Sequence, residues 1–163
     1  MTSSVPVDPS FSEAKGRDRI VQYLTDTVKE LPPQLSLSWQ HPKYAHSVFG
    51  DAHIVPCVND DEIPNPPLNV GAEYWVVGVP DGQEKQYFQT ILDVWNKFGW
   101  RTVIDTSASP QIFGRARTPD DYAINVVDNG QGDLAVTISS PCFPHQNTGG
   151  NPPARNASAS VTN

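Results

Sequence analysis

The sequence predicts an α+β fold, in which a mostly antiparallel sheet carries two main helices packed on one face and one disulfide holds the domain together. Two stretches, 10–31 and 81–99, have apolar residues at helical spacing. The runs between and after them are short and rich in β-branched and aromatic residues. The resulting order is helix, two strands, strand, helix, strand and hairpin, which is typical of a single α+β sandwich.

The first helix is expected from Ser10 to about Leu31. Ser10 and Glu13 fit a capping box, and apolar residues then follow a 3.6-residue spacing. A pair of prolines ends the helix, because a proline ring removes a hydrogen-bond donor and clashes with the preceding turn. Residues 1–9 show no periodicity and are expected to form a flexible tether.

Three strands are expected before the second helix. Residues 35–39 alternate like a half-buried strand, 40–50 are interpreted as a loop, and 53–57 as a short strand. The acidic, proline-rich segment 59–67 is interpreted as an extended surface connection, since proline cannot donate to a sheet. Residues 74–79 are apolar on both faces, which is typical of a central strand.

The second helix is expected to be capped by residues 81–84 and to end before Gly99, where a left-handed residue is favoured. Its apolar face is broad, which indicates burial against the sheet. Residues 101–106 then predict a strand, and 107–121 are interpreted as a long loop.

A hairpin closes the predicted domain. The β-rich runs 122–127 and 134–139 flank a glycine-containing turn. Residues 146–163 are polar and rich in Asn, Ala, Ser and Pro, so a disordered C-terminal tail is expected there. The sequence therefore predicts one α+β domain over residues 10–145, between the tether and the tail.

Charge and hydropathy argue against two classes of partner. The formal net charge is −7, whereas nucleic acids and anionic lipid surfaces are bound by clustered Lys and Arg. No run of about 18 apolar residues occurs, so no transmembrane span is expected. Residues 1–9 read like the polar tether after a processed export signal, with Met1 as an initiator in place of a removed leader.

The two cysteines, Cys57 and Cys142, are expected to form the disulfide. Both stand beside prolines in segments that look like strand ends or rigid loops. Closing the long chain segment between them stabilises the fold by about 4 to 5 kcal/mol in the chain-entropy model. The pairing indicates an oxidising compartment. The alternative is two free thiols in an intracellular protein.

No catalytic, metal-binding or cofactor-binding site is expected. The sequence has no nucleotide-binding glycine loop, nucleophile elbow or Cys-x-x-Cys pair, and its histidines lack the spacing of zinc ligands. The loop residues His41 and His46 are interpreted as solvated. The alternative is a small hydrolase, which would place one of the loop histidines, including His53, within hydrogen-bond reach of Asp51, Asp60 or Asp121.

Two groups of residues are candidate contacts for a ligand or partner. Tryptophans on the strands could line an apolar pocket, although aromatic side chains there are more often core. The segment 111–117 combines apolar and basic residues in an acidic protein, which favours a contact with an anionic group, against the alternative of a flexible flap. The candidate contacts are Trp39, Trp75, Phe113, Arg115 and Arg117.

A family resemblance rests on the second half of the chain. Gly78 leads into a long helix that ends at Gly99, followed by a strand, a hairpin and the segment 138–143. This pattern resembles the LppA-like mycobacterial, or actinobacterial, lipoproteins, over roughly residues 12–144. In that family one cysteine follows the first helix and a second follows the hairpin, and Cys57 and Cys142 occupy these places.

The resemblance implies an exported lipoprotein of the cell envelope, with a signal and a lipid anchor on an N-terminal cysteine. This sequence has no such cysteine. The predicted function is non-enzymatic binding of an envelope partner protein or of an apolar, lipid-like envelope molecule. The alternatives are the small hydrolase and an intracellular or phage structural protein with two reduced thiols.

Overall fold

The computed structural model describes residues 7–58, 63–149 and 156–158. This part of the chain holds two helices and eight strands. Their bounds are α1 Glu13–Lys29, β1 Ser36–Ser38, β2 His53–Pro56, β3 Leu68–Val77, α2 Glu84–Lys97, β4 Arg101–Asp105, β5 Ile112–Arg117, β6 Ala123–Asp128, β7 Leu134–Ser139 and β8 Asn156–Ser158.

The strands form a single antiparallel sheet in the order β4-β5-β6-β7-β3-β1-β8, and β2 pairs with β3 beside this path. The long strand β3 lies inside the sheet, as its apolar pattern predicts. Three strands separate β3 from β4, although these two flank α2 in the sequence. The α+β fold with a mostly antiparallel sheet is therefore confirmed.

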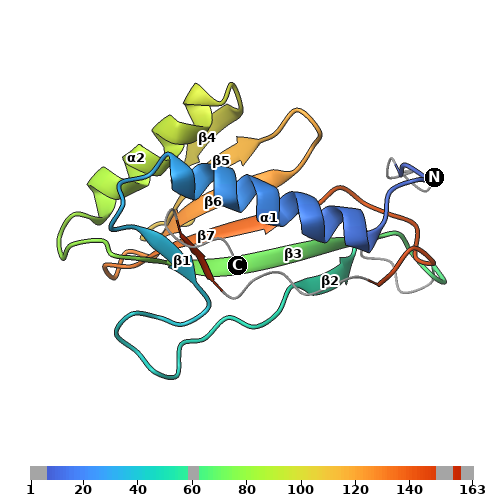
Figure 1. Ribbon diagram of the computed structural model, residues 1–163, viewed down its shortest axis with the longest axis horizontal. Helices are drawn as coiled ribbons and strands as arrows, with labels where there is room; N and C mark the ends of the chain where they lie inside the picture. The colour runs from blue at the N-terminus through green and yellow to red at the C-terminus, as the bar shows by residue number, and fades with distance from the viewer. Residues whose placement is uncertain (1–6, 59–62, 150–155, 159–163) are drawn as a thin grey trace.

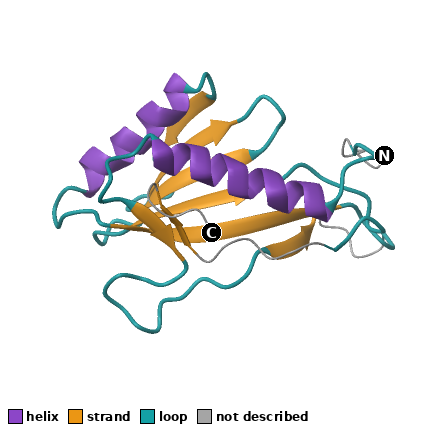
Figure 2. Ribbon diagram, viewed as in Figure 1, coloured by secondary structure: helices purple, strands orange, loops and turns teal. Residues whose placement is uncertain are grey.

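Both helices lie on the same face of the sheet, as predicted (Figures 1 and 2). Helix α1 runs over β3, whereas α2 contacts β4, β5 and β6. Between the layers lies a continuous core of buried side chains, including Ile20, Leu24, Tyr74, Ile91 and Trp95. Burying each such side chain contributes about 1.5 to 3 kcal/mol, so the core accounts for the choice of one helix-covered face.

The N-cap of the first helix lies two residues later than expected. It is Ser12, whose side chain accepts a hydrogen bond from the Lys15 backbone N–H at 3.3 Å. Ser10 does not cap the helix, because its own N–H and hydroxyl both donate to Asp8 Oδ1. The carboxylate of Glu13 pairs with Arg17, so the predicted capping box is wrong.

The second helix ends as predicted, with Gly99 in the left-handed conformation at φ 84°. Its start differs. The N-cap is Gln83, which makes no side-chain cap hydrogen bond. Glu84 Oε1 instead accepts from the backbone N–H of Gly82 at 3.0 Å, so the side chain of Glu84 orders the turn before the helix.

Strand β5 lies within the segment predicted to be a long loop, so that prediction is wrong. Gly114 and Ala116 face the helix layer and are buried, while Arg115 and Arg117 are exposed. The space under α2 requires small residues, because a Cβ on Gly114 would come within 2.8 Å of Leu92 Cδ2. Small inward residues hide the apolar alternation by which strands are recognised.

Part of the predicted tail is ordered against the domain. Asn147 Nδ2 donates to the carbonyl oxygens of Pro9 and Phe11, and the Gly149 N–H donates to Glu13 Oε1. Asn156–Ser158 form β8, which pairs with β1 at the sheet edge. The rest of the predicted tail from residue 150 on, and residues 1–6 of the predicted tether, lie outside the described residues.

Cys57 and Cys142 form the predicted disulfide, with 6.3 Å between their Cα atoms. The bond joins the chain after β2 to the chain after β7. Beside it, the backbones of Leu68 and Phe143 form an isolated antiparallel bridge. Within the described ranges, neither helix is long and apolar enough to cross a membrane.

Candidate functional site

No helix or strand of the described residues covers the sheet face opposite the helices over β4, β5, β6 and β7 (Figure 1), and we call it the open face. Strand register aligns its side chains in rows across neighbouring strands. One row is Asp105, Phe113, Val127, Ala135 and Trp75. The next is Val103, Arg115, Asn125, Thr137 and Glu73, and the third is Arg101, Arg117, Ala123, Ser139 and Gly71.

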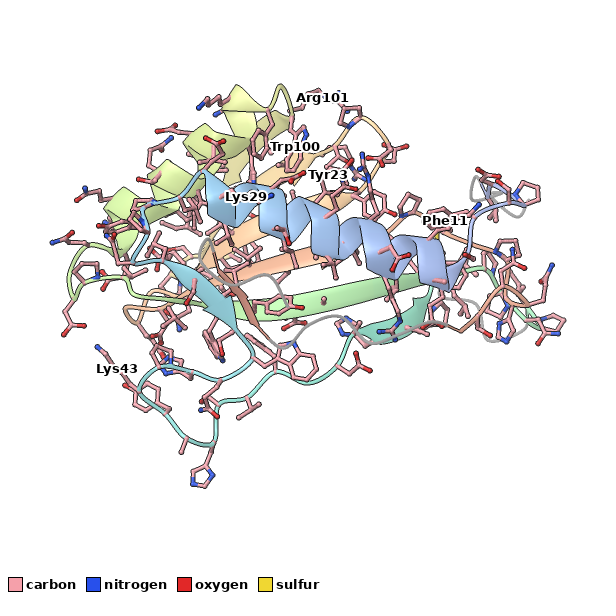
Figure 3. The ribbon with its side chains drawn as sticks, viewed as in Figure 1. Phe11, Tyr23, Lys29, Lys43, Trp100 and Arg101 are labelled. Atoms are coloured by element: carbon pink, nitrogen blue, oxygen red, sulfur yellow. A yellow bond between two sulfur atoms is a disulfide. The ribbon has the colours of Figure 1, made fainter. Side chains whose placement is uncertain are left out.

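Three arginines, Arg101, Arg115 and Arg117, form what we call the arginine end of the open face. All three are exposed, and they line a shallow depression of about 450 Å³ together with Val103 and Asn125. Figure 3 places Arg101 beside Trp100 at this end of the molecule. The depression lies on three adjacent strands, β4, β5 and β6, and not between the sheet and the helices.

Arg115 is held in place by two neighbours. Its guanidinium nitrogens Nε and Nη2 lie 3.2 and 3.1 Å from Asp105 Oδ2, and its charge stands 4.6 Å from the centre of the Phe113 ring. Hydrogen bonds from the hydroxyl and backbone N–H of Ser107, and then the hydrogen bond from Arg115, lower the pKa of Asp105. Asp105 is therefore ionised at neutral pH.

Arg101 and Arg117 lie directly opposite each other in the β4–β5 register. Neither forms an ion pair with any residue in the described ranges. Like charges in directly opposed positions destabilise a strand pair. In a chain with a net charge of −7, two unpaired and mutually repelling guanidinium groups indicate a place where an external anion is favoured.

The other end of the open face is covered by the 40–49 loop. The Trp75 indole Nε1 donates to the Ser47 carbonyl oxygen at 3.0 Å, and the Phe49 ring stacks on Trp75 at 4.7 Å between ring centres. Trp39 packs against the core and hydrogen bonds to Tyr74. Burial raises the pKa of Tyr74 to about 12, against the opposing effect of this hydrogen bond.

The five predicted contact residues thus do not form one patch. Phe113, Arg115 and Arg117 project together from the open face of β5. Trp75 shares a row with Phe113, but two strands separate them and the protein's own loop packs over the indole. Trp39 belongs to the core side. Of the five predicted contacts, only the three on β5 lie together in the structure, at or beside the arginine end.

His41 is buried, and its predicted solvation is wrong. Its Nδ1 accepts backbone hydrogen bonds from Lys43 and Tyr44 at 2.9 and 3.1 Å. Two donors at Nδ1 assign the proton to Nε2, which donates to Asp133 Oδ1 at 2.8 Å. Both ring nitrogens are therefore occupied, and His41 ties the 40–49 loop to the β6–β7 hairpin.

The pairs expected of the hydrolase alternative are not seen in the described part of the chain. No histidine there hydrogen bonds to Asp51 or Asp121, whereas Asp60 lies outside the described residues. His145 Nδ1 contacts the carbonyl oxygen of Pro66 at 3.2 Å. Among the same residues, no group of three acidic, histidine or cysteine side chains converges as metal ligands would.

A second polar cluster, absent from the candidates named from sequence, surrounds Asp120. Its carboxylate accepts hydrogen bonds from the Tyr23 hydroxyl, from Thr118 Oγ1 at 2.7 Å and from Arg19 Nε at 3.2 Å. Tyr23 also packs edge-on against Trp100 at 5.0 Å between ring centres (Figure 3). In the sequence, this cluster is indicated by the spacing of Arg19 and Tyr23, which lie one helical turn apart.

The Asp120 cluster joins α1 to the turn before β6. Burial acts to raise the pKa of Asp120, but the hydrogen bonds from Tyr23, Thr118 and Arg19 outweigh it and lower the pKa. Burial, together with the hydrogen bond to Asp120, raises the pKa of Tyr23. These groups satisfy one another. The depression of about 610 Å³ beside them is also lined by Asp8, Lys15 and Asp121, so its charges are of mixed sign, whereas those of the arginine residues at the arginine end are all positive.

Comparisons with known proteins add no relative. No protein-family model, curated protein or solved structure matches this chain.

Proposed function

We propose that this protein is an exported, non-enzymatic module of the cell envelope that binds an acidic segment of a partner protein at the arginine end of its open face. Disulfides persist in oxidising compartments, so the Cys57–Cys142 bond supports export. The resemblance to LppA-like lipoproteins supports a location in the cell envelope and a lipid anchor outside this sequence.

One observation carries the binding role. Arg101 and Arg117 oppose each other without a carboxylate partner in the described residues, and Arg115 lies next to both on the same face. Guanidinium groups bind carboxylates through charge-assisted, often bidentate hydrogen bonds. An acidic segment therefore relieves the repulsion between the two arginines and gains hydrogen bonds.

The shape of the site favours a protein partner over a lipid-like molecule. The depression lies on the surface of the sheet, and its lining combines the three arginines with shorter side chains such as Ala123 and Asn125. The space between the sheet and the helices, where an acyl chain would be buried, is filled by core side chains such as Trp95 and Tyr74. Phe113 and Val103 add apolar contact beside the charges.

A non-enzymatic role is supported by the hydrogen bonding within the polar clusters. The ring nitrogens of His41 and the carboxylate of Asp120 are saturated with internal hydrogen bonds. Such groups hold structure together and are poorly placed to exchange protons with a substrate.

Titration by NMR tests this proposal, with a glutamate-rich peptide as the probe. We expect the amide signals of β4, β5 and β6 to shift, and Arg117→Gln to weaken the affinity about tenfold, because a charge-assisted hydrogen bond is lost. Lys85→Gln is the matched control, since it removes an equal charge from an exposed site on α2.

A second probe separates the two kinds of partner. A fatty-acid carboxylate carries the same anionic group on an apolar chain. If this amphiphile binds at β5 and the peptide does not, the proposal of an acidic protein segment is wrong and a lipid-like ligand is favoured. If Arg117→Gln and Lys85→Gln weaken peptide binding equally, the arginine end is not the binding site.

A further inference from the structure

Strand β4 is an open edge of the sheet. Among the described residues it pairs with β5 alone, so its other side presents backbone N–H and C=O groups that no described strand pairs with. Two of its apolar side chains are also uncovered, with Val103 59 % and Ile104 50 % exposed. An exposed apolar edge strand is a site for pairing with another strand.

The usual protection of such an edge is missing from β4. The strand contains no proline, and its two charged residues, Arg101 and Asp105, stand at opposite ends and have opposite signs. Charges of one sign would repel a second copy of the same strand. Opposite signs at the two ends instead make the strand complementary to itself in an antiparallel arrangement.

We propose that β4 pairs with β4 of a second copy of this chain, antiparallel, about a two-fold axis at Val103. In this register Val103 lies opposite its own counterpart. Arg101 lies opposite Asp105 of the second copy, and Thr102 lies opposite Ile104 of the second copy. Each dimer then contains two symmetric Arg–Asp pairs on the open face and one apolar contact on the axis.

Dimerisation also corrects an unfavourable feature of the monomer. Arg101 faces Arg117 across β4–β5 and has no acidic partner in the described part of one chain. In the dimer Arg101 gains the carboxylate of the opposing Asp105, which the pKa shift keeps ionised. The inference is carried by the edge of the sheet and not by its face, but it shares Arg101 with the proposed binding site: in the dimer Arg101 pairs with Asp105 of the second copy, and Arg117 is left for the acidic segment.

Complementary charge reversals test the register. We expect Arg101→Asp alone and Asp105→Arg alone to raise the dimer dissociation constant about tenfold or more, because each places like charges opposite each other twice per dimer. An equimolar mixture of the two variants restores one favourable Asp–Arg pair and keeps one native pair. Sedimentation velocity should therefore show dimers in the mixture but not in either variant at the same concentration.

Lys85→Asp, a charge reversal on the exposed surface of α2, is the control and should leave the dimer unchanged. Asp105→Arg also loses the ion pair with Arg115, so circular dichroism is used to check that this variant still folds. A wild-type protein that is monomeric at its highest soluble concentration contradicts the proposal. A dimer that survives both single reversals contradicts it as well.

Cysteine cross-linking tests the axis without changing charge. Residues facing each other across an antiparallel pair have Cα atoms about 4.5 to 5.5 Å apart, within the range of a disulfide. Val103→Cys should therefore cross-link two chains under mild oxidation. Ile104→Cys is the matched control, since its counterpart would lie about 8 Å away by strand geometry. Equal cross-linking at both positions would contradict the two-fold axis.

Discussion

At the scale of single residues, buried His41 and the more exposed Asp120 each connect segments that are distant in sequence. His41 joins a loop to the β6–β7 hairpin through Asp133, and Asp120 joins the turn before β6 to α1 through Tyr23 and Arg19. A buried polar group left without its partner costs about 1 to 3 kcal/mol. These contacts are therefore expected to hold the loops in place.

Replacing His41 by alanine should lower the free energy of unfolding by about 2 to 3 kcal/mol. The change removes the contact to Asp133 and leaves the N–H groups of Lys43 and Tyr44 without their acceptor. Urea denaturation measures the difference. His46→Ala, at an exposed position of the same loop, should change stability by less than about 0.5 kcal/mol. Equal effects of the two variants would contradict the proposed role of His41 in holding the loop against the hairpin.

Asp120 predicts a specific dependence of stability on pH. Its folded-state pKa is lowered, so its contribution is present above the unfolded value of about 3.9 and is lost as the pH falls through the folded value. Wild type should be more stable than Asp120→Asn at neutral pH, and the difference should shrink in acid. Urea denaturation over a pH series tests this, and a difference that stays constant with pH would contradict it.

At the scale of elements, the strand-helix packing explains which parts of the fold the sequence revealed. Helix α2 and strand β3 were predictable, because their apolar residues repeat at the spacing of their own structure. Strand β5 was hidden, since the layer above it leaves room only for Gly114 and Ala116. Strand β8 was hidden as well, because a short polar edge strand is specified by its neighbour β1 and not by its own composition.

The close contact under α2 gives a prediction for Gly114. An added Cβ would meet Leu92 Cδ2 and Val126 Cγ1, each at 2.8 Å, so Gly114→Ala should cost about 1 to 3 kcal/mol of stability through overpacking. In the Leu92→Ala background the same change should cost less, because the contacts with Leu92 are then removed and only the one with Val126 remains. Gly50→Ala, with no atom within 4 Å of the added Cβ, is the control. An unchanged midpoint in urea for Gly114→Ala would contradict this packing.

The candidate site, like the fold, could be predicted only in part from the sequence. Phe113, Arg115 and Arg117 were recognised as a basic and apolar group in an acidic chain, and their chemistry did not depend on whether the segment was a loop or a strand. Arg101 could not be added from sequence, because its position opposite Arg117 follows from the β4–β5 register. The packing of the 40–49 loop over Trp75 likewise depends on contacts between distant segments.

At the scale of the whole molecule, the Cys57–Cys142 disulfide connects structure with location. It closes a segment with a sequence separation of 85 residues, which corresponds to about 4 to 5 kcal/mol in the chain-entropy model. A domain stabilised in this way is suited to an oxidising compartment, and a reducing one would remove this contribution. The proposed envelope module therefore depends on the bond being present in the cell.

The most direct measurement is the mass of the protein isolated from the cells that produce it, alkylated under denaturing conditions with and without reductant. In an exported protein with the Cys57–Cys142 disulfide, neither of the two cysteines should be alkylated until reductant is added. If both are alkylated without reductant, the disulfide is absent in the cell, the exported module is contradicted, and an intracellular role is favoured.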